Sequence, residues 1–104
     1  MDLRRYRIAD GRVPFTIWLH GLDNSTAARV SAYVDRMKFG NWGTSKPVGQ
    51  GVSELKIDFG PGYRVYYIRD GSIIVVLLCG GSKGSQKADV RLALEFAADY
   101  RRRK

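Results

Sequence analysis

The fold of this chain is decided by one central stretch, Glu54-Leu55-Lys56-Ile57-Asp58-Phe59-Gly60-Pro61-Gly62-Tyr63-Arg64-Val65-Tyr66-Tyr67-Ile68. The Gly60-Pro61-Gly62 turn divides it into two segments rich in aromatic and β-branched residues. Asp70-Gly71 then divides the second segment from an apolar run over residues 73–78. Tight turns between such segments are typical of hairpins. The pattern therefore predicts three strands in an antiparallel meander.

Polar side chains occupy one parity of the first two expected strands. They are Glu54, Lys56, Arg64 and Tyr66. Because successive side chains of a strand point to opposite sides, these four share one face of the sheet. The other parity carries Leu55, Ile57, Val65 and Tyr67, which we expect to face a core.

One short strand and two helices are expected before the meander. Residues 3–8 mix apolar and basic positions, which predicts a strand at a sheet edge. Pro14 suits the first turn of a helix, whose apolar positions follow the i, i+3, i+4, i+7 spacing at Phe15, Trp18, Leu19 and Leu22. Asp23-Asn24-Ser25 supplies cap residues for a second helix, and Gly40 ends it. The two helices are expected to form a hairpin over the apolar face of the sheet.

The remaining segments are a loop, a glycine-rich turn and a last helix. Residues 41–47 are rich in turn formers and predict a loop, in which Trp42 is either a packed anchor or an exposed stacking platform. Residues 79–86 lack the spacing of a phosphate-binding P-loop. Ser85 is expected to cap the final helix. The basic end of that helix, residues 101–104, either complements the helix dipole or binds a polyanion.

The predicted fold class is α+β, with a single domain over residues 1–104. A small antiparallel sheet, made of the N-terminal strand and the three-stranded meander, is expected to pack against the two-helix hairpin. The C-terminal helix is the one element left to cover part of the polar face. We therefore expect that face to be open to a partner.

A strong positive charge sets the class of partner. The chain has 18 Lys and Arg against 10 Asp and Glu, a net charge of +8. Such an excess favours nucleic acid or an acidic protein surface, although a basic surface kept for solubility is the alternative.

Cysteine, histidine and apolar content limit the remaining possibilities. The lone Cys79 cannot form an intramolecular disulfide and suits a reducing compartment. One histidine and one cysteine offer no N/S cluster for zinc, so we expect neither metal nor cofactor. No signal sequence is apparent, and the longest apolar run, residues 73–79, is shorter than the about 20 residues that span a bilayer. The expected location is the cytoplasm, without membrane contact.

A set of glycine, proline and charged residues, spaced irregularly along the chain, together matches the pattern of a known family. The positions are Gly40-Asn41-x-Gly43, then Lys46-Pro47-Val48-Gly49-x-Gly51-Val52-x-Glu54-Leu55-Lys56-Ile57, then Phe59-Gly60-Pro61-Gly62-Tyr63-Arg64-Val65-Tyr66-Tyr67, and finally Leu77-Leu78-x-Gly80-Gly81-x-Lys83-x-x-Gln86-x-x-Asp89. With Phe15-x-x-Trp18-Leu19-x-x-Leu22-Asp23 upstream, they cover nearly the whole chain. The chain resembles the RelE/HigB-type toxins of type II toxin–antitoxin modules, in particular the phage-derived group called addiction module killer proteins.

The resemblance implies a RelE-like toxin that enters the ribosomal A site and cleaves mRNA without a metal. The 2′-hydroxyl attacks the adjacent phosphate, and basic side chains stabilise the charge that develops. An antitoxin, commonly a helix-turn-helix protein, holds such a toxin inactive and makes the contacts to operator DNA. The chain is thus expected to be an RNA endonuclease with ribosome, mRNA and antitoxin as partners.

The polar residues of the chain suit this chemistry. Arg64 is the expected grip on the scissile phosphate, and Lys83 is an electrostatic partner or a proton donor to the leaving oxygen. Glu54 is a general base or orients Lys56. The expected RNA contacts are Lys46 to phosphate, Tyr66 by stacking on a base and Gln86 by hydrogen bonding.

Simpler roles stay open for these residues, and so do two other functions. Arg64 and Glu54 can be an ion pair on an exposed sheet face, and Lys83 and Gln86 can merely solvate a turn and begin a helix. Several ribosome-dependent members of the family use a histidine or a C-terminal tyrosine. Here His20 lies elsewhere and Tyr100 is the only late aromatic hydroxyl, so the general acid is unassigned. The alternatives are a non-enzymatic ParE-like toxin that inhibits DNA gyrase and an inactive homologue that only binds its antitoxin.

Overall fold

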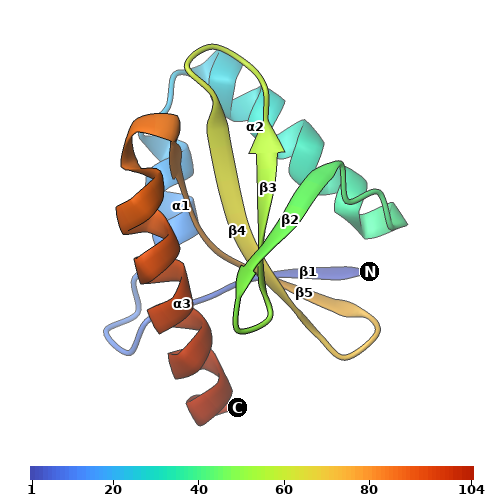
Figure 1. Cartoon of the computed structure of the whole chain (residues 1–104), viewed down its shortest axis with the longest axis vertical. Helices are drawn as coiled ribbons and strands as arrows, with labels where there is room; N and C mark the ends of the chain where they lie inside the picture. The colour runs from blue at the N-terminus through green and yellow to red at the C-terminus, as the bar shows by residue number, and fades with distance from the viewer.

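A five-stranded sheet runs through the molecule, with helices on both of its faces (Figure 1). The computed structural model describes all residues, 1–104. The strand order is β1-β5-β4-β3-β2. The strands are β1 (Asp2–Arg5), β2 (Thr44–Gly49), β3 (Val52–Ile57), β4 (Tyr63–Asp70) and β5 (Ile74–Ser82). Neighbouring strands are antiparallel except β1, which lies parallel to β5.

Three α-helices and two short 3₁₀ turns complete the fold. They are α1 (Pro14–His20), α2 (Asn24–Arg36), η1 (Met37–Phe39), η2 (Lys83–Ser85) and α3 (Gln86–Arg103). Asp23 caps α2 by accepting hydrogen bonds from the backbone N and the Oγ1 of Thr26, at 3.2 and 2.6 Å. Gly40 ends η1 in the left-handed region, at φ 78°. None of the helices has the length and hydropathy needed to cross a membrane.

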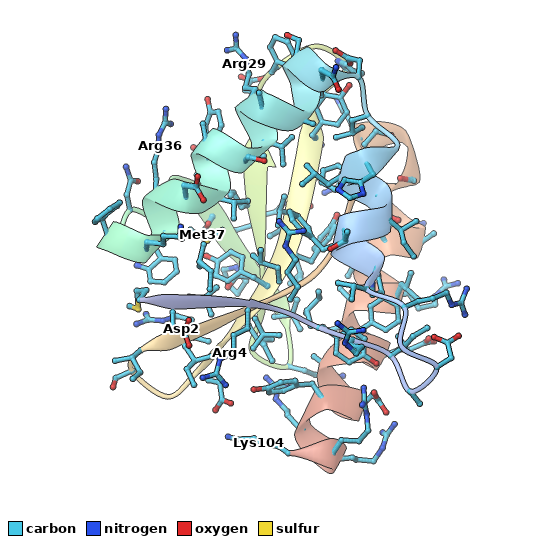
Figure 2. The ribbon with its side chains drawn as sticks, turned by 180° about the vertical axis from the view of Figure 1, so that it is seen from behind. Asp2, Arg4, Arg29, Arg36, Met37 and Lys104 are labelled. Carbon is cyan, nitrogen blue, oxygen red and sulfur yellow. The ribbon has the colours of Figure 1, made fainter.

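Each face of the sheet builds its own core. One core joins α1 and α2 to the predicted apolar parity, and its members include Phe15, Leu19, Val30, Val34, Leu55, Ile57, Val65 and Tyr67. The other core joins α3, through Ala93 and Ala97, to Val52, Tyr66, Ile68, Leu78 and Cys79. Figures 1 and 2, seen from opposite sides, show α3 in front of the sheet in one view and α1 with α2 in front in the other.

The α+β class, the three helices and the meander are confirmed, and two details of the sheet differ from expectation. The segment expected to be a loop contains β2, so the sheet has five strands. Pro47 lacks a backbone N–H, but β2 is an edge strand, where that loss is tolerated, and its register shifts between Pro47 and Gly49. The sheet is also mixed, because the long crossover through α1, α2 and the meander brings β5 alongside β1 in the same direction.

Trp42 acts as an anchor. Its ring stacks on Tyr67 with a centroid distance of 5.8 Å and an interplanar angle of 12°. The guanidinium of Arg69 lies 4.6 Å from the centroid of the same ring. The tryptophan thus joins the start of β2 to β4.

Candidate functional site

Glu54 is the centre of a charged cluster on the α3 face of the sheet. The register places it opposite Lys46 of β2 and opposite Tyr66 of β4. Its side chain is buried, with 2% of the residue exposed. Oε1 accepts hydrogen bonds from the Tyr66 hydroxyl at 3.1 Å and from Gln86 Nε2 at 2.8 Å, and it lies 3.2 Å from Arg64 Nε. These donors compensate the desolvation of a buried carboxylate.

Arg64 is the second buried charge and has hydrogen-bonding capacity to spare. It lies on β4 opposite Lys56 and Gly81, and 7% of it is exposed. Its Nε and Nη1 atoms are buried and have no hydrogen-bond partner in the protein, although Nε is close to Glu54. Buried donors without partners are costly, and Arg64 also lines a pocket, so an acceptor that enters the pocket beside the guanidinium is favoured. An anion is the ligand that its charge selects.

A pocket of about 150 Å³ opens beside these two charges. Its lining is entirely polar or charged: Thr44, Ser45, Lys46, Glu54, Lys56 and Arg64, from β2, β3 and β4. Lys46 Nζ lies 3.7 Å from Glu54 Oε2, and the side chains of Lys46 and Lys56 are exposed. Three cations around one carboxylate leave an excess of positive charge. We call this the Glu54 pocket.

Lys83 lies next to the pocket, on the far side of Gly62. Its backbone N donates to the Gly62 carbonyl at 3.1 Å. A Cβ built on Gly62, whose φ is +88°, would stand 3.7 Å from Arg64 Nη1 and 3.9 Å from Lys83 Cβ. The glycine therefore lets the Lys83 and Arg64 side chains approach the same point. Lys83 is exposed.

The polar face is not open over its whole area, which corrects the expectation. α3 packs on it through Ala93 and Ala97, whose small side chains allow a close approach. Tyr66 is 0% exposed, so its ring offers no surface on which a base can stack. Its hydroxyl instead serves Glu54, and burial, followed by the charge of Glu54, raises the pKa of Tyr66. The pair of Arg64 and Glu54 is buried, not exposed.

The structure therefore sorts the predicted site residues into three positions. Glu54, Lys46, Lys56 and Arg64 line the Glu54 pocket. Lys83 does not line the pocket and lies beside Gly62, near Arg64. Tyr66 and Gln86 donate hydrogen bonds to Glu54.

Two residues of the pocket were missed from sequence. Thr44 and Ser45 belong to the segment assigned to a loop, and Thr44 pairs with Lys56 in the register. The alternation of Thr44 and Lys46 was the available signal. Nowhere do three or more His, Cys, Asp or Glu side chains gather as a metal site would require.

The fold and the pocket define a small basic α+β protein that presents a cationic pocket on a sheet. The model of the family described as phage-derived protein Gp49-like (DUF891) matches residues 17–98, and the chain belongs to this family. The family is part of the addiction module killer and toxin group, which implies an antitoxin as partner. An uncharacterised protein of Haemophilus influenzae is 45% identical over 86 residues, which cover 82% of this chain and 87% of that protein.

Proposed function

We propose that this protein is the toxin of a type II toxin–antitoxin module and that it cleaves mRNA on the ribosome without a metal. The observation that supports cleavage most is Arg64, a buried guanidinium with unpartnered donors beside a cationic pocket. Family membership supports the toxin class. The choice of mRNA on the ribosome rests on the resemblance to RelE/HigB-type toxins and on the net charge of +8.

The reaction requires charge stabilisation at one phosphate. The 2′-oxygen loses its proton and forms a bond to phosphorus, while the bond from phosphorus to the 5′-oxygen breaks and the leaving 5′-oxygen takes up a proton, from Lys83 or from water. The products are a 2′,3′-cyclic phosphate and a 5′-hydroxyl. Arg64 binds non-bridging oxygens, whose negative charge grows in the transition state, and Lys56 and Lys83 flank the same phosphate. All three are catalytic residues in this proposal.

Glu54 is assigned the role of general base. Its Oε1 already accepts hydrogen bonds from Tyr66 and Gln86 and lies 3.2 Å from Arg64 Nε, whereas Oε2 meets only Lys46, at 3.7 Å. Oε2 is therefore the oxygen left to take the proton from the 2′-hydroxyl. Tyr66 and Gln86 act through Glu54 and are positioning residues. Lys46 neutralises backbone phosphate at the entrance.

The test uses purified protein, translating ribosomes and a reporter mRNA, with primer extension as the readout. We expect cleavage by the wild type and a loss of about a hundredfold or more for Arg64→Gln, because one transition-state donor is worth that much. Arg36→Gln is the matched control, since Arg36 is an exposed arginine at the end of α2 (Figure 2), a helix that packs on the opposite face of the sheet from α3. Equal cleavage by wild type and Arg64→Gln would refute the assignment.

A supercoiling assay with DNA gyrase, run on the same preparation, separates the alternatives. Inhibited gyrase with intact mRNA would favour the ParE-like function. Absence of both effects, together with normal growth of cells that express the chain without antitoxin, would indicate an inactive homologue.

A further inference from the structure

A second cluster of cations lies at the other end of α3. Arg4, Arg5 and Arg7, from β1 and the chain that follows it, meet Arg103 and Lys104 around a cavity of about 290 Å³. We call this the basic cavity. Figure 2 shows Arg4 and Lys104 at the same end of the molecule, away from Arg29 and Arg36 on α2.

The basic cavity is separate from the Glu54 pocket. Gln86, the first residue of α3, contacts Glu54, and Arg103, the last, lines the basic cavity. Seventeen residues separate them along the helix, which at 1.5 Å per residue amounts to about 25 Å. No cation belongs to both sites.

The carboxylates near the cavity hold its floor in place. Asp99 accepts from the Tyr6 hydroxyl at 2.5 Å and from Arg103 Nε at 2.8 Å. Asp70 accepts from the Tyr100 hydroxyl at 2.7 Å and from Lys104 Nζ at 2.5 Å. The hydrogen bonds from Arg103 and Lys104, each followed by that of a tyrosine, lower the pKa of Asp99 and of Asp70. These pairs tie the last turn of α3 to the sheet.

The arginines of the amino-terminal segment have donors left over. Arg5 donates to Thr16 Oγ1 at 2.8 Å and Arg7 to the Gly11 carbonyl at 2.7 Å, and neither has a carboxylate partner within ion-pair distance. A guanidinium carries five N–H donors, so most of theirs face solvent. Arg4 pairs with Asp2, but both side chains are more than half exposed, and such a pair is weak and screened by salt.

We propose that the basic cavity is a second RNA-binding site, which takes backbone phosphates and reads no sequence. It rests on the proposed function in one respect, namely that the polyanion is RNA. Arginine forks match phosphate oxygens bidentately, which favours a phosphate polymer over an acidic protein. Tyr6 offers no face for stacking, because it is buried and the guanidinium of Arg103 lies over its ring, 5.6 Å from the centroid. Charges kept for solubility alone would be better dispersed, since convergent cations repel one another.

The consequence for function is a two-point grip. An RNA held at the basic cavity has to extend over about the length of α3, about 25 Å, to reach the end of the helix where Gln86 contacts Glu54. The basic cavity supplies affinity that depends on salt, and the Glu54 pocket supplies the chemistry. A strand bound at both points is held more tightly than at either one.

The experiment measures RNA binding by fluorescence anisotropy at a series of salt concentrations. The probes are a labelled hairpin RNA and a labelled single-stranded RNA of the same length. The test variant combines Arg4→Gln, Arg7→Gln and Lys104→Gln. The control combines Arg29→Gln, Arg36→Gln and Lys38→Gln, which removes the same charge from exposed positions of α2 and η1.

We expect the test variant to bind at least one probe about tenfold more weakly than the control does, with the slope of log K against log salt reduced by about 2. A stronger effect on the hairpin would assign the cavity to folded RNA, and a stronger effect on the single strand to the messenger. Arg4→Lys with Arg7→Lys retains the charge and loses the bidentate forks, so it is expected to bind more tightly than the glutamine variant and more weakly than wild type. Urea unfolding of the glutamine variant checks that it is folded.

Three outcomes would overturn the inference. Equal losses in the test and control variants would mean that only net charge matters. Unchanged RNA binding in the test variant would remove the site. Displacement of RNA by polyglutamate at equal charge concentration, with the difference between variants retained, would assign the cavity to an acidic protein.

The inference and the proposed function fail separately. RNA binding that depends on the basic cavity, without any mRNA cleavage, would support the inference and refute the proposed enzymatic function. Cleavage that depends on Arg64, together with RNA binding that is unchanged by the substitutions in the basic cavity, would support the proposed function and refute the inference.

Discussion

Glu54 and Arg64 are two buried charges that depend on each other for their stability. Their closest atoms, Oε1 and Nε, lie 3.2 Å apart, and no other carboxylate lies within ion-pair distance of Arg64. Removing one member of a buried pair leaves the other uncompensated, which typically costs about 3 to 5 kcal/mol. Conservative substitutions such as Arg64→Gln and Glu54→Gln are therefore better probes than truncation to alanine. Each must be accompanied by a measurement of unfolding.

Removing the hydroxyl of Tyr66 tests whether its hydrogen bond positions Glu54. Tyr66→Phe keeps the buried ring and deletes the 3.1 Å hydrogen bond to Oε1. We expect urea unfolding to report a loss of about 1 to 2 kcal/mol, and the cleavage rate to fall by about tenfold because Glu54 gains freedom.

Tyr63→Phe is the control for this change, on the same strand but facing the α1 side of the sheet. It is expected to leave cleavage unchanged. Unaltered stability and cleavage in Tyr66→Phe would mean that the hydroxyl does not position Glu54.

α3 is the element that turns a sheet face into a site. It covers Tyr66 with Ala93 and Ala97 and delivers Gln86 to Glu54. Its first turn passes over Gly81, where an added Cβ would stand 1.8 Å from Asp89 Oδ2. The absence of a side chain at Gly81 thus leaves room for the Asp89 carboxylate, which accepts a hydrogen bond from Ser85 at the start of the helix.

Gly81→Ala is predicted to displace the Asp89 carboxylate and the Ser85 hydroxyl, which share a hydrogen bond at the start of α3. We expect a loss of about 1 to 3 kcal/mol in unfolding free energy, the usual cost of overpacking, and reduced cleavage because the same turn of α3 carries Gln86. Gly84→Ala is the matched control, since its added Cβ would meet only Ser82 Oγ, at an ordinary 3.9 Å. Equal stability of the two variants would contradict this account of the packing.

Local sequence patterns correctly predicted the helices, the meander and the faces of its strands. They did not predict the contacts between residues that are far apart in the sequence. Strand alternation correctly assigned Glu54, Lys56, Arg64 and Tyr66 to one face. The apolar stripe of α3 gave no indication of which face the helix covers, because amphipathic spacing orients a helix without choosing its partner. The bond from Gln86 to Glu54 joins residues 32 apart, and no local pattern reports such a contact.

β2 was missed for a related reason. Its residues include Gly49 and Pro47, which argue locally for a turn, and the pairing with β3 outweighs that preference. The parallel placement of β1 was equally hidden, since strand direction at an edge depends on the whole crossover.

Over the whole molecule, the paired aspartates make stability depend on acid. Hydrogen bonds lower the pKa of Asp23, mainly from Thr26, of Asp70, mainly from Lys104, and of Asp99, mainly from Arg103. A carboxyl whose folded pKa lies below its unfolded value of about 3.9 contributes stability above that pH and loses it as the pH falls through the folded pKa. Protonation also adds to a net charge that is already +8.

We therefore expect the thermal midpoint to be nearly constant from pH 7 to about 5 and to fall steeply below about pH 4. Differential scanning calorimetry at low salt measures it. Asp23→Asn keeps a capping oxygen but cannot ionise, so its midpoint is expected to fall less steeply in acid. A midpoint that rises below pH 4 would contradict the role given to these carboxylates.

The most direct test of the central claim is the chemistry of the cut RNA ends. Mass spectrometry determines these ends after incubation with ribosomes. EDTA is present at a concentration that leaves the ribosome's own Mg²⁺ in place. Cleavage by attack of the 2′-hydroxyl in the Glu54 pocket predicts 2′,3′-cyclic phosphate and 5′-hydroxyl ends, produced by the wild type and lost in Arg64→Gln. Ends that carry a 3′-hydroxyl, or cyclic phosphate ends formed equally by Arg64→Gln, would contradict it.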